Sequence, residues 1–419
     1  MSFTSPILAG CAVSHRQSIS VERALELATA HAPGTPLAAR APLHSLRGRI
    51  LAEPFVAAHP VPPFANAAMD GFALARHDLE QAMTIGLPLD APILAGSAPR
   101  VMRKGMACPI TTGAPIPQGA DVVVEQERCH LREGRVVLHT APSVKPHIRG
   151  VGEDVAAGAL LAPAGRIVTP RLASVASASG TAQASVRAPL RIALVSTGDE
   201  IVTAGAPLHP GQIHDSVRSF LSMELQHPSL RLIDLGVQPD QTERVAEALQ
   251  EAAACADLVL TTGGASVGRA DPVGAALGIT GAEEIFQGVK MRPGKPLGLH
   301  LLNGVPVVTL PGNPFAAAVG YYLVVRHMIE TALGAAIFSC ETRPARLSAN
   351  TRIRSGNAEF VPVSLAMDQS GGTPFATIIS RGSSASLSPL AAADGIAMLS
   401  GPDAMLLAGA EVPVLKFGS

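Results

Sequence analysis

RIALVS, at Arg191–Ser196, is the first of four short apolar runs in the stretch that decides the fold, residues 187–334. The other three are RLIDLG (Arg231–Gly236), DLVLTT (Asp257–Thr262) and VPVVTL (Val305–Leu310). Segments with apolar residues at helical spacing alternate with these runs, at Ser216–Gln226, Asp240–Ala256 and Phe315–Leu333. Short apolar runs are typical of buried strands, and their alternation with helices predicts βαβ units around a parallel sheet.

Glycines and acids follow three of these predicted strands. The three segments are Ser196-Thr197-Gly198-Asp199-Glu200, then Thr261–Gly268 with Asp271 behind it, and Pro311-Gly312-Asn313-Pro314. Ligands of parallel sheets bind beyond the carboxyl ends of the strands. Glycines there let backbone N–H groups approach a phosphate, and the carboxylates suit a Mg²⁺ ion that neutralises a pyrophosphate. The alternative is that the glycines only form tight turns and the acids only cap helices.

A pair of fixed cations precedes the last strand, in Arg292-Pro293-Gly294-Lys295-Pro296. A tetrahedral or phosphate-like oxyanion suits two cations held around one turn. The alternative is a surface turn with solvated charges. The position of the turn on the same sheet edge favours a functional role.

The rest of the chain divides into parts of different character. Ser20–His31 has helical periodicity behind a serine that can cap it, and Thr169-Pro170 opens a second helix. Residues 51–145 contain short β-rich runs between prolines and glycines, and β-like runs return from Glu341 onward. We therefore expect a β-rich domain (51–145), an α/β domain (186–335) and a C-terminal β domain (336–419).

Composition excludes several classes of function. The 419 residues carry a net charge of −1 with no Trp and two Tyr, which disfavours nucleic acid and anionic lipid as partners. No GxxxxGK[ST] occurs and no GxGxxG follows a strand, so Walker-type and dinucleotide sites are not expected. The five cysteines form no CxxC and the histidines no HxxxH, which favours a reducing compartment and disfavours a zinc site. Prolines and glycines break the longest uncharged run, Pro296–Val325, so we expect no membrane span and a cytoplasmic location.

Segments of the β-rich part also carry candidate residues. Pro63–Phe72 places apolar side chains around one acid, Asp70, as a buried or interfacial loop does. Thr112–Pro115 has the composition of a turn. Arg149 precedes Glu153-Asp154, and the three are interpreted as a local ion pair.

In their order and spacing, these segments resemble the molybdopterin molybdenumtransferase family, which comprises the bacterial molybdate-insertion enzyme and the E domain of gephyrin. The resemblance covers nearly the whole chain. Its motifs are PPFANAAMDGFA (Pro62–Ala73), TGAPIPQGADVVV (Thr112–Val124), Arg149 with Gly152-Glu153-Asp154, VSTGDEI (Val195–Ile201), GQIHDS (Gly211–Ser216), TTGGASVGRAD (Thr261–Asp271), RPGKP (Arg292–Pro296) and LPGNP (Leu310–Pro314).

The resemblance implies a multidomain α/β plus β fold: a doubly wound molybdopterin-binding-type domain, a β-rich domain, an extended helical segment (residues 1–50 and 146–185) and a C-terminal β barrel-like domain. It implies a homodimer whose cleft lies between the α/β domain of one subunit and the β-rich domain of the other. The implied activity is a transferase reaction of molybdenum cofactor biosynthesis. Adenylylated molybdopterin is cleaved with Mg²⁺, molybdate enters the dithiolene, and AMP is released. Transient contacts with apo-molybdoenzymes or other cofactor-synthesis proteins are also implied.

The resemblance also assigns roles to individual residues. The implied catalytic residues are Asp70, Thr112, Glu200, Asp240, Asp271 and Lys295, of which Glu200, Asp240 and Asp271 hold the metal. The implied substrate-binding residues are Arg149, Asp154, Ser196, Thr197, Gly198, Asp199, Asp215, Ser216, Gly263, Gly264, Ser266, Gly268, Arg292, Pro311, Gly312, Asn313 and Ser384.

The sequence departs from the family pattern at several of these segments. Arg292 stands where the family usually has Lys, which keeps the charge but changes the donor geometry. Val217 replaces an Asn, and Gln241 and Pro272 replace an Asp and a Tyr. Asn357 occupies a position where the family frequently has Arg, and that Arg belongs to the molybdate site. Loss of one charged hydrogen bond weakens anion binding by about 1.5–3 kcal/mol.

Three hypotheses follow from the sequence. The first is an active molybdenum or tungsten insertase, because the four acids Asp70, Glu200, Asp240 and Asp271 are all present. The second is a non-catalytic paralogue that binds molybdopterin and delivers the cofactor to a partner enzyme. Its basis is that Val217 removes a polar group, and Asn357 a cation, from the oxyanion site that the resemblance implies. The third, an unrelated sugar-nucleotide enzyme, leaves the motifs of the β-rich part unexplained.

Overall fold

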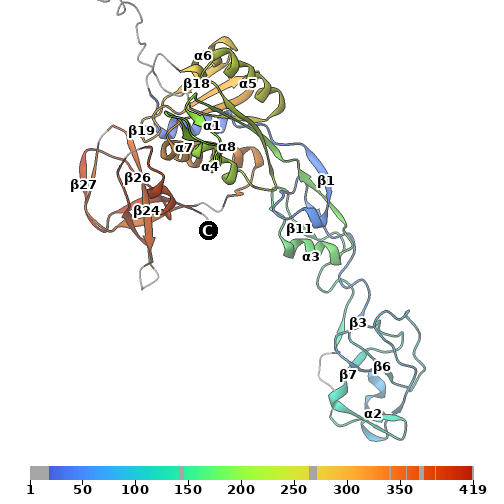
Figure 1. Cartoon of the computed structure of the whole chain (residues 1–419). Coiled ribbons are helices and arrows are strands. Elements are labelled where there is room, and N and C mark those ends of the chain that lie inside the picture. The colour runs from blue at the N-terminus through green and yellow to red at the C-terminus, as the bar shows by residue number, and fades with distance from the viewer. Residues whose placement is uncertain are drawn as a thin grey trace, which may run out of the picture. The chain divides into compact units, whose positions relative to one another are not determined.

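The structure is a computed structural model, and it describes residues 18–140, 146–263, 271–338, 341–354, 356–367, 372–382 and 384–417. The candidate residues Gly264, Ser266 and Gly268 lie outside the described residues, as do Cys11 and Cys340. Two compact units make up the chain (Figure 1). Unit 1 takes in the described residues up to Ala39, Gly48–Ile50 and those from Arg187 onward, and unit 2 takes in Arg40–Arg47 and Leu51–Val186.

A six-stranded sheet with the order β16-β13-β17-β21-β20-β18 forms the centre of the α/β domain in unit 1. Its four predicted strands are β13 (Leu190–Thr197), β16 (Leu230–Gln238), β17 (Leu258–Thr262) and β21 (Val305–Leu310). These four pair in parallel, as the alternating pattern predicts. Val245 and Leu249 of α5 (Thr242–Cys255) are fully buried in the same cluster as Val195, Val259 and Val307, so the helix covers the strands through its apolar face.

The sheet also has an antiparallel edge, which the alternating strand and helix pattern does not predict. β20 (Gly298–Leu302) and β18 (Glu283–Gln287) are antiparallel neighbours of β21. Asn303 and Gly304 join β20 to β21, and both have positive φ, +53° and +80°. Two central residues with positive φ make the two-residue turn that fits antiparallel strands. The Asn-Gly pair therefore carries the signal for this hairpin.

Helices cover the sheet on both sides in the sequence order expected for βαβ units (Figure 1). Besides α5 they are α4 (Ser216–Glu224), α6 (Pro272–Ile279), α7 (Pro314–Gly320) and α8 (Arg326–Leu333). The predicted single helix at Phe315–Leu333 is α7 and α8 joined by a π-helical segment, Tyr321–Val325. The N-terminal helix α1 (Val21–Ala30) has the predicted Ser20 cap and packs against α8 within unit 1, where Thr29 Oγ1 lies 2.7 Å from His327 Nε2.

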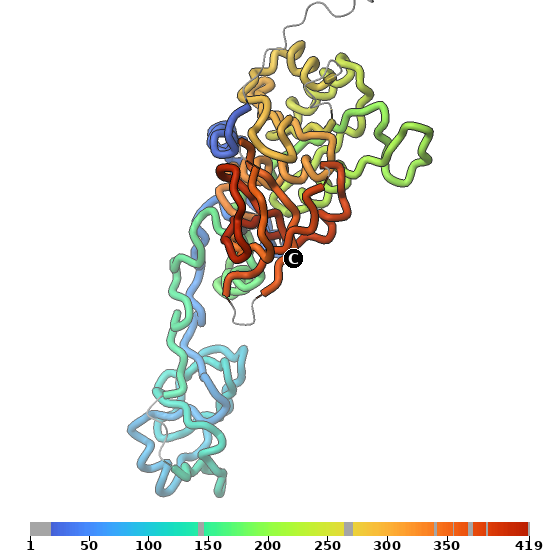
Figure 2. Tube along the Cα trace, turned by 90° about the vertical axis from the view of Figure 1, so that its left-hand side faces the viewer, coloured from blue at the N-terminus to red at the C-terminus, as the bar shows by residue number. Residues whose placement is uncertain are grey.

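Five strands of the C-terminal domain close into a barrel-like sheet, because β24 pairs with both β25 and β26. The strands are β22 (Glu341–Leu347), β24 (Ala358–Ala366), β25 (Phe375–Ile378), β26 (Gly395–Leu399) and β28 (Glu411–Lys416). Figure 2 follows them in orange to red. A short strand of the preceding region, β19 (Met291–Arg292), pairs in parallel with β24 and places Arg292 opposite Glu359. The cationic turn is therefore attached to this sheet.

Unit 2 is β-rich and has two α-helices among its described residues: α2 (Leu79–Thr84) and, near the end of the unit, α3 (Pro170–Ala178), capped by Thr169. Two three-stranded sheets bury the apolar side chains: β6 (Cys108–Ile110), β4 (Gly71–Leu74) and β7 (Val122–Glu125), then β5 (Leu87–Pro88), β9 (Arg135–Leu138) and β8 (Cys129–Arg132). The segments around β2 (Phe55–Val56) and β11 (Leu160–Ala162), blue and green in Figure 2, run side by side. The domain boundaries predicted from the sequence stay a prediction.

Candidate functional site

The carboxyl ends of β13, β17 and β21 meet at one edge of the sheet, because these strands are parallel neighbours. Gly263 follows β17 with φ +87°, and a Cβ at this position would lie 2.3 Å from the carbonyl oxygen of Thr197. A Cβ at Gly312 would lie 3.4 Å from the Cα of Gly263. Only glycine at position 263 allows the ends of β13 and β17 so close an approach, and the turn after β21 lies within van der Waals contact of it. The structure thus brings together the loops that the sequence singles out.

The hydroxyl groups at this edge join the strands to one another. Ser196 and Thr197 are buried, with 1% and 3% of their surfaces exposed. Thr262 Oγ1 donates to Ser196 Oγ at 3.1 Å, and Thr197 Oγ1 donates to the Thr262 carbonyl at 3.4 Å. The Ser196 and Thr197 side chains therefore serve to join the strands. The part of this edge that suits an anion is the backbone of the glycine turns.

Four carboxylates lie around the same edge. The backbone N–H of Asp240 donates to Asp199 Oδ1 at 3.0 Å. Burial raises the pKa of Asp240, and the negative charges of Asp199 and Glu200 raise it further. The pKa of Asp271 is also raised, by burial and by the charge of Asp240. Groups that resist ionisation beside other carboxylates are typical of sites that take up a cation.

Asp271 also has the structural role that the alternative interpretation gives it. Its Oδ1 accepts the N–H groups of Val273 and Gly274, both at 3.0 Å, and so caps α6. Among the described residues, no three His, Cys, Asp or Glu side chains are close enough to hold a metal ion by themselves. The predicted metal ligands Glu200, Asp240 and Asp271 therefore do not form a closed cage here.

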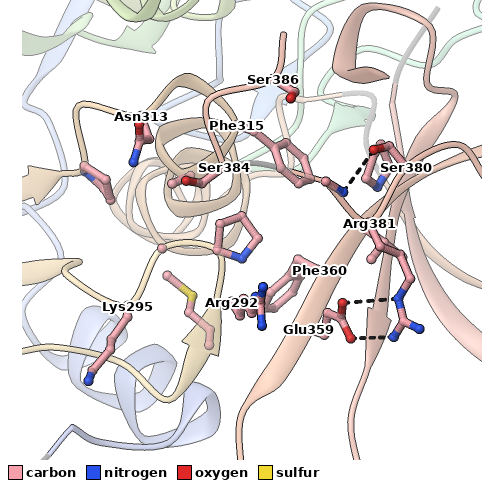
Figure 3. Close-up of a pocket in the computed structure, with 18 of the residues that line it drawn as sticks. Arg292, Lys295, Asn313, Phe315, Glu359, Phe360, Ser380, Arg381, Ser384 and Ser386 are labelled. Carbon is pink, nitrogen blue, oxygen red and sulfur yellow. Dashed lines mark hydrogen bonds and ion pairs between the residues drawn. The ribbon is translucent and has the colours of Figure 1, made fainter. Parts of the chain in front are cut away.

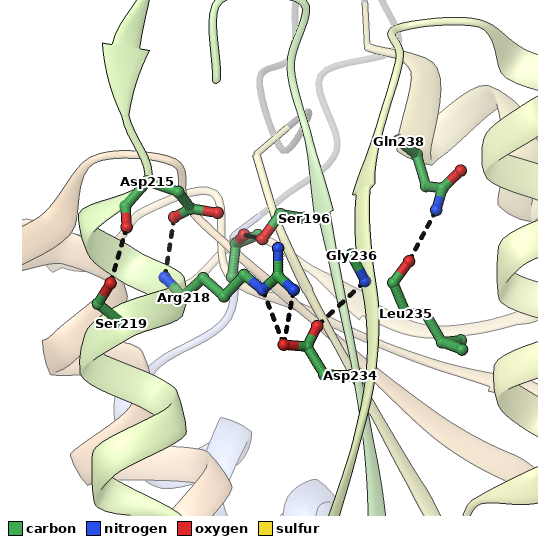
Figure 4. Close-up of polar contacts among 9 residues, drawn as sticks. Ser196, Asp215, Arg218, Ser219, Asp234, Leu235, Gly236 and Gln238 are labelled. Carbon is green, nitrogen blue, oxygen red and sulfur yellow. Dashed lines mark hydrogen bonds and ion pairs between the residues drawn. The ribbon is translucent and has the colours of Figure 1, made fainter. Parts of the chain in front are cut away.

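Asp215 is the N-cap residue of α4. Its carboxylate accepts the N–H of Arg218 at 2.9 Å, and its carbonyl accepts Ser219 Oγ at 3.1 Å (Figure 4). The residue is 6% exposed, and its Oδ2 has no hydrogen-bond partner among the described residues. The Arg218 side chain donates to Asp234 Oδ2, from Nη2 at 2.6 Å and from Nε at 2.9 Å (Figure 4). The Gly236 N–H donates to the other oxygen of Asp234, Oδ1.

A cavity of about 380 Å³ lies between the cationic turn and the C-terminal domain, both in unit 1 (Figure 3). It is lined by five predicted site residues: Arg292, Lys295, Pro311, Asn313 and Ser384. The turn is fixed by its backbone, since Val289 N–H donates to the Lys295 carbonyl at 2.9 Å and Leu297 N–H to that of Gly294 at 3.0 Å. Both cations are exposed, and both line the cavity.

Two further charged residues line this cavity and were not predicted from the sequence. Glu359 and Arg381 form an ion pair in which Arg381 Nη2 lies 2.5 Å from Glu359 Oε2 (Figure 3). They are brought together by strand pairing across the C-terminal domain, and no local motif marks either of them. Asn357, at the position where the resemblance implies Arg, is not among the described residues that line the cavity. Val217, another departure, is buried in α4 with 5% of its surface exposed.

Unit 2 brings Asp70 and Thr112 together. The N–H of Thr112 donates to Asp70 Oδ1 at 2.6 Å, and its hydroxyl donates to the same oxygen at 2.8 Å. These hydrogen bonds hold the pKa of Asp70 below its usual range. The carboxylate is therefore ionised and oriented, as a group that binds a cation or a donor must be.

Arg149 and Asp154 lie in another part of unit 2. Arg149 is exposed in β10 (Ile148–Arg149), opposite Asn66 of β3 (Asn66–Ala67), and the Asp154 N–H donates to the Val61 carbonyl at 3.0 Å. The interpretation of Arg149 with Glu153-Asp154 as an ion pair is wrong. Glu153 accepts the Gly150 N–H at 2.7 Å instead, and the structure, which describes all three residues, forms no ion pair between them. The Glu153 carboxylate is thus bonded within its own turn.

Among the described residues no helix is both long enough and apolar enough to cross a membrane. The doubly wound domain with glycine loops, acids and a cationic cavity is typical of a multidomain α/β enzyme that handles an anionic small molecule. Three family models match the chain: the MoeA N-terminal region (domains I and II) at residues 19–180, a probable molybdopterin-binding domain at 193–331, and the MoeA C-terminal region (domain IV) at 344–417. The chain belongs to the molybdopterin molybdenumtransferase family, a family of transferases in molybdenum cofactor biosynthesis.

Individual relatives agree over most of the chain. The molybdopterin molybdenumtransferase of Haemophilus influenzae is 35% identical over 301 residues, which cover 70% of this chain and 72% of the relative. The molybdopterin molybdenumtransferase 2 of Mycobacterium tuberculosis is 34% identical over 368 residues, 85% of this chain and 89% of the relative. A crystal structure of the molybdopterin biosynthesis protein MoeA from Pyrococcus horikoshii superposes with a TM-score of 0.83 at 28% identity, covering 96% of this chain and all of that one.

Proposed function

We propose that the chain is an active molybdopterin molybdenumtransferase that inserts molybdate into the dithiolene of adenylylated molybdopterin and releases AMP. The observation that carries the proposal is the cavity of about 380 Å³ that places Arg292 and Lys295 beside the loop after β21. Two cations in one cavity suit a tetrahedral dianion better than a neutral ligand. Ser384 adds a hydroxyl group to the same wall.

The glycine loops are the proposed binding site for the phosphate-bearing part of the substrate. Gly263 and Gly312 leave backbone unscreened by side chains where β17 and β21 end. Asn313 and Pro314 start α7 directly after this turn, so the positive end of the helix dipole faces the loop. A pyrophosphate bound here lies close to the residues that line the oxyanion cavity, since Pro311 and Asn313 belong to both.

The carboxylates fit Mg²⁺ by their chemistry. They offer only oxygen donors, and a cation relieves the repulsion that helps to raise the pKa of Asp240 and of Asp271. Mg²⁺ commonly takes one or two protein carboxylates together with substrate phosphates, so a closed protein cage is not required. Glu200, Asp240 and Asp271 would hold the ion, which when bound neutralises charge on the pyrophosphate. The α6 N–H groups orient Asp271 for this contact.

We assign Asp70 and Thr112 of unit 2 to catalysis, and Arg149 and Asp154 to substrate contacts, as the resemblance implies. A homodimer in the cytoplasm, with transient contacts to apo-molybdoenzymes, belongs to the same proposal. A non-catalytic carrier is the second candidate. Two observations favour this alternative. Val217 at the start of α4 is apolar and buried, and Asn357 does not line the cavity, so position 357 supplies no cation to it.

AMP release from adenylylated molybdopterin, measured with and without molybdate in Mg²⁺, separates the two candidates. We expect molybdate-dependent AMP release, with a product that activates an apo-molybdoenzyme. Glu200→Gln and Lys295→Gln should each slow the reaction at least tenfold. Arg244→Gln, which removes an exposed cation on α5 outside the cavity, is the matched control and should not. Tight pterin binding without AMP release under any oxyanion would identify a carrier.

A further inference from the structure

Arg381 and Glu359 form a two-point ion pair in the wall of the cavity (Figure 3). Arg381 Nη2 donates to Glu359 Oε2 at 2.5 Å, and its Nε donates to Oε1 at 3.2 Å. Nη2 also donates to the Arg352 carbonyl at 2.7 Å, which fixes the guanidinium to the neighbouring backbone. The Glu359 and Arg381 side chains are only 13% and 32% exposed. The pair is thus partly removed from water, where a charged contact counts for more than at an open surface.

Glu359 is the only acid among the described residues that line the cavity, and three cations line it as well: Arg292, Lys295 and Arg381. The strand register puts Arg292 directly opposite Glu359. In Figure 3 the Glu359 carboxylate lies between Arg292 and the Arg381 guanidinium, while Lys295 lies at the far side of the view. Three cations against one carboxylate leave a formal charge of +2. With the charge of Glu359 counted, the net charge of the cavity lining therefore matches that of a dianion.

We propose that Arg381 is an oxyanion-binding residue of this cavity and that Glu359 is a tethered carboxylate that competes with the oxyanion for it. The Nε and Nη2 edge of a guanidinium binds two oxygens of one anion, whether they belong to a carboxylate or to a tetrahedral oxyanion. Glu359 occupies that edge in the structure. An incoming dianion takes the edge from Glu359, so the carboxylate sets how tightly the cavity binds. This inference rests on the proposed oxyanion cavity.

The test is calorimetric titration of the full-length protein with molybdate, and with sulfate as a second tetrahedral dianion, at fixed ionic strength. Arg381→Gln should weaken binding of both dianions at least tenfold, which is about 1.4 kcal/mol. Glu359→Gln keeps the shape and one acceptor oxygen but removes the charge, so it should tighten binding by about tenfold. Arg381→Lys, which keeps the charge and loses the fork, should lie between Arg381→Gln and the parent.

Two matched controls change charges of the same domain outside the cavity wall. Asp403→Asn breaks the exposed two-point pair with Arg352, and Arg346→Gln breaks the exposed pair with Glu411. Both should leave dianion affinity within twofold of the parent. Circular dichroism of every variant establishes that the C-terminal domain is folded.

The outcomes separate this inference from the proposed function. If Lys295→Gln weakens binding while Arg381→Gln does not, the oxyanion cavity stands and the role of Arg381 is refuted. If Glu359→Gln weakens binding, Glu359 supports the guanidinium rather than competes with the anion, and the inference is wrong. If the parent binds no tetrahedral dianion, both the oxyanion cavity and the inference fail.

Discussion

Gly263→Ala is the substitution that most directly tests the convergence of the strand-end loops. Gly263 has φ +87°, a conformation that an L-residue adopts at a cost of roughly 1–2 kcal/mol. The added methyl carbon would also lie 2.3 Å from the Thr197 carbonyl oxygen and 2.9 Å from its Oγ1. Because the first of these atoms belongs to the backbone of β13, a side-chain rotation cannot relieve the contact. The ends of β13 and β17 must separate.

Overpacking of this kind adds about 1–3 kcal/mol to the backbone cost. We therefore expect Gly263→Ala to destabilise the α/β domain by about 2–5 kcal/mol. Gly236→Ala is the matched control, because Gly236 lies on β16 of the same sheet with φ +79° and has nothing within 4 Å of its would-be Cβ. It should cost only the backbone part, about 1–2 kcal/mol.

Thermal unfolding of the full chain, with hydrogen exchange at β13 and β17 to identify the domain that unfolds, measures the difference between the two variants. A multidomain chain need not unfold in one step, so the exchange data are needed to assign the transition. Gly263→Ala should also weaken binding of adenylylated molybdopterin, whereas Gly236→Ala should not. Equal losses of stability in the two variants would refute the close approach of the loops.

The remaining predictions concern the carboxylates. The folded-state pKa of Asp240 is raised, so its favourable contribution exists below its ordinary pKa of 3.8 and is lost as pH rises through the higher folded value. Asp240→Asn should therefore raise the melting temperature at pH 7 without Mg²⁺, and Mg²⁺ should raise that of the parent more than that of the variant. Asp271→Ala should cost about 1 kcal/mol of stability through the lost α6 cap, while Asp271→Asn keeps the cap and should cost less, as denaturant titrations of both will measure. Thr112→Val should raise the pKa of Asp70 towards 3.8, because one of its two hydrogen bonds is removed, and carboxyl NMR titration will detect the change.

The sequence predicts the α/β domain well where one element carries its own signal. The apolar run at β13 and the Pro-opened helix α3 need no distant partner to be recognised, because periodicity and capping act within a few residues. The antiparallel edge strand β18 has no such signal. Its sequence, EEIFQ, has three polar residues out of five, and only pairing with β20 makes it a strand.

The candidate site divides in the same way. Residues directly after a strand, such as Gly263 and Asp271, follow from the rule that parallel strands present their carboxyl ends together. The pKa shifts could not be predicted, because they depend on burial and on charges that come from separate loops.

The cavity shows why a departure from the family pattern at one position does not by itself remove a function. Asn357 leaves the cavity without the arginine that the resemblance implies, and this counted in favour of a carrier. Antiparallel pairing of β24 with β25, in which Val363 lies opposite Ile378, brings Arg381 beside Glu359 at the same wall. A guanidinium is therefore present in the cavity, supplied from the segment that follows β25. Since the charge of a site depends on which groups surround it and not on their order in the chain, the absence of Arg at position 357 loses its weight against an active insertase.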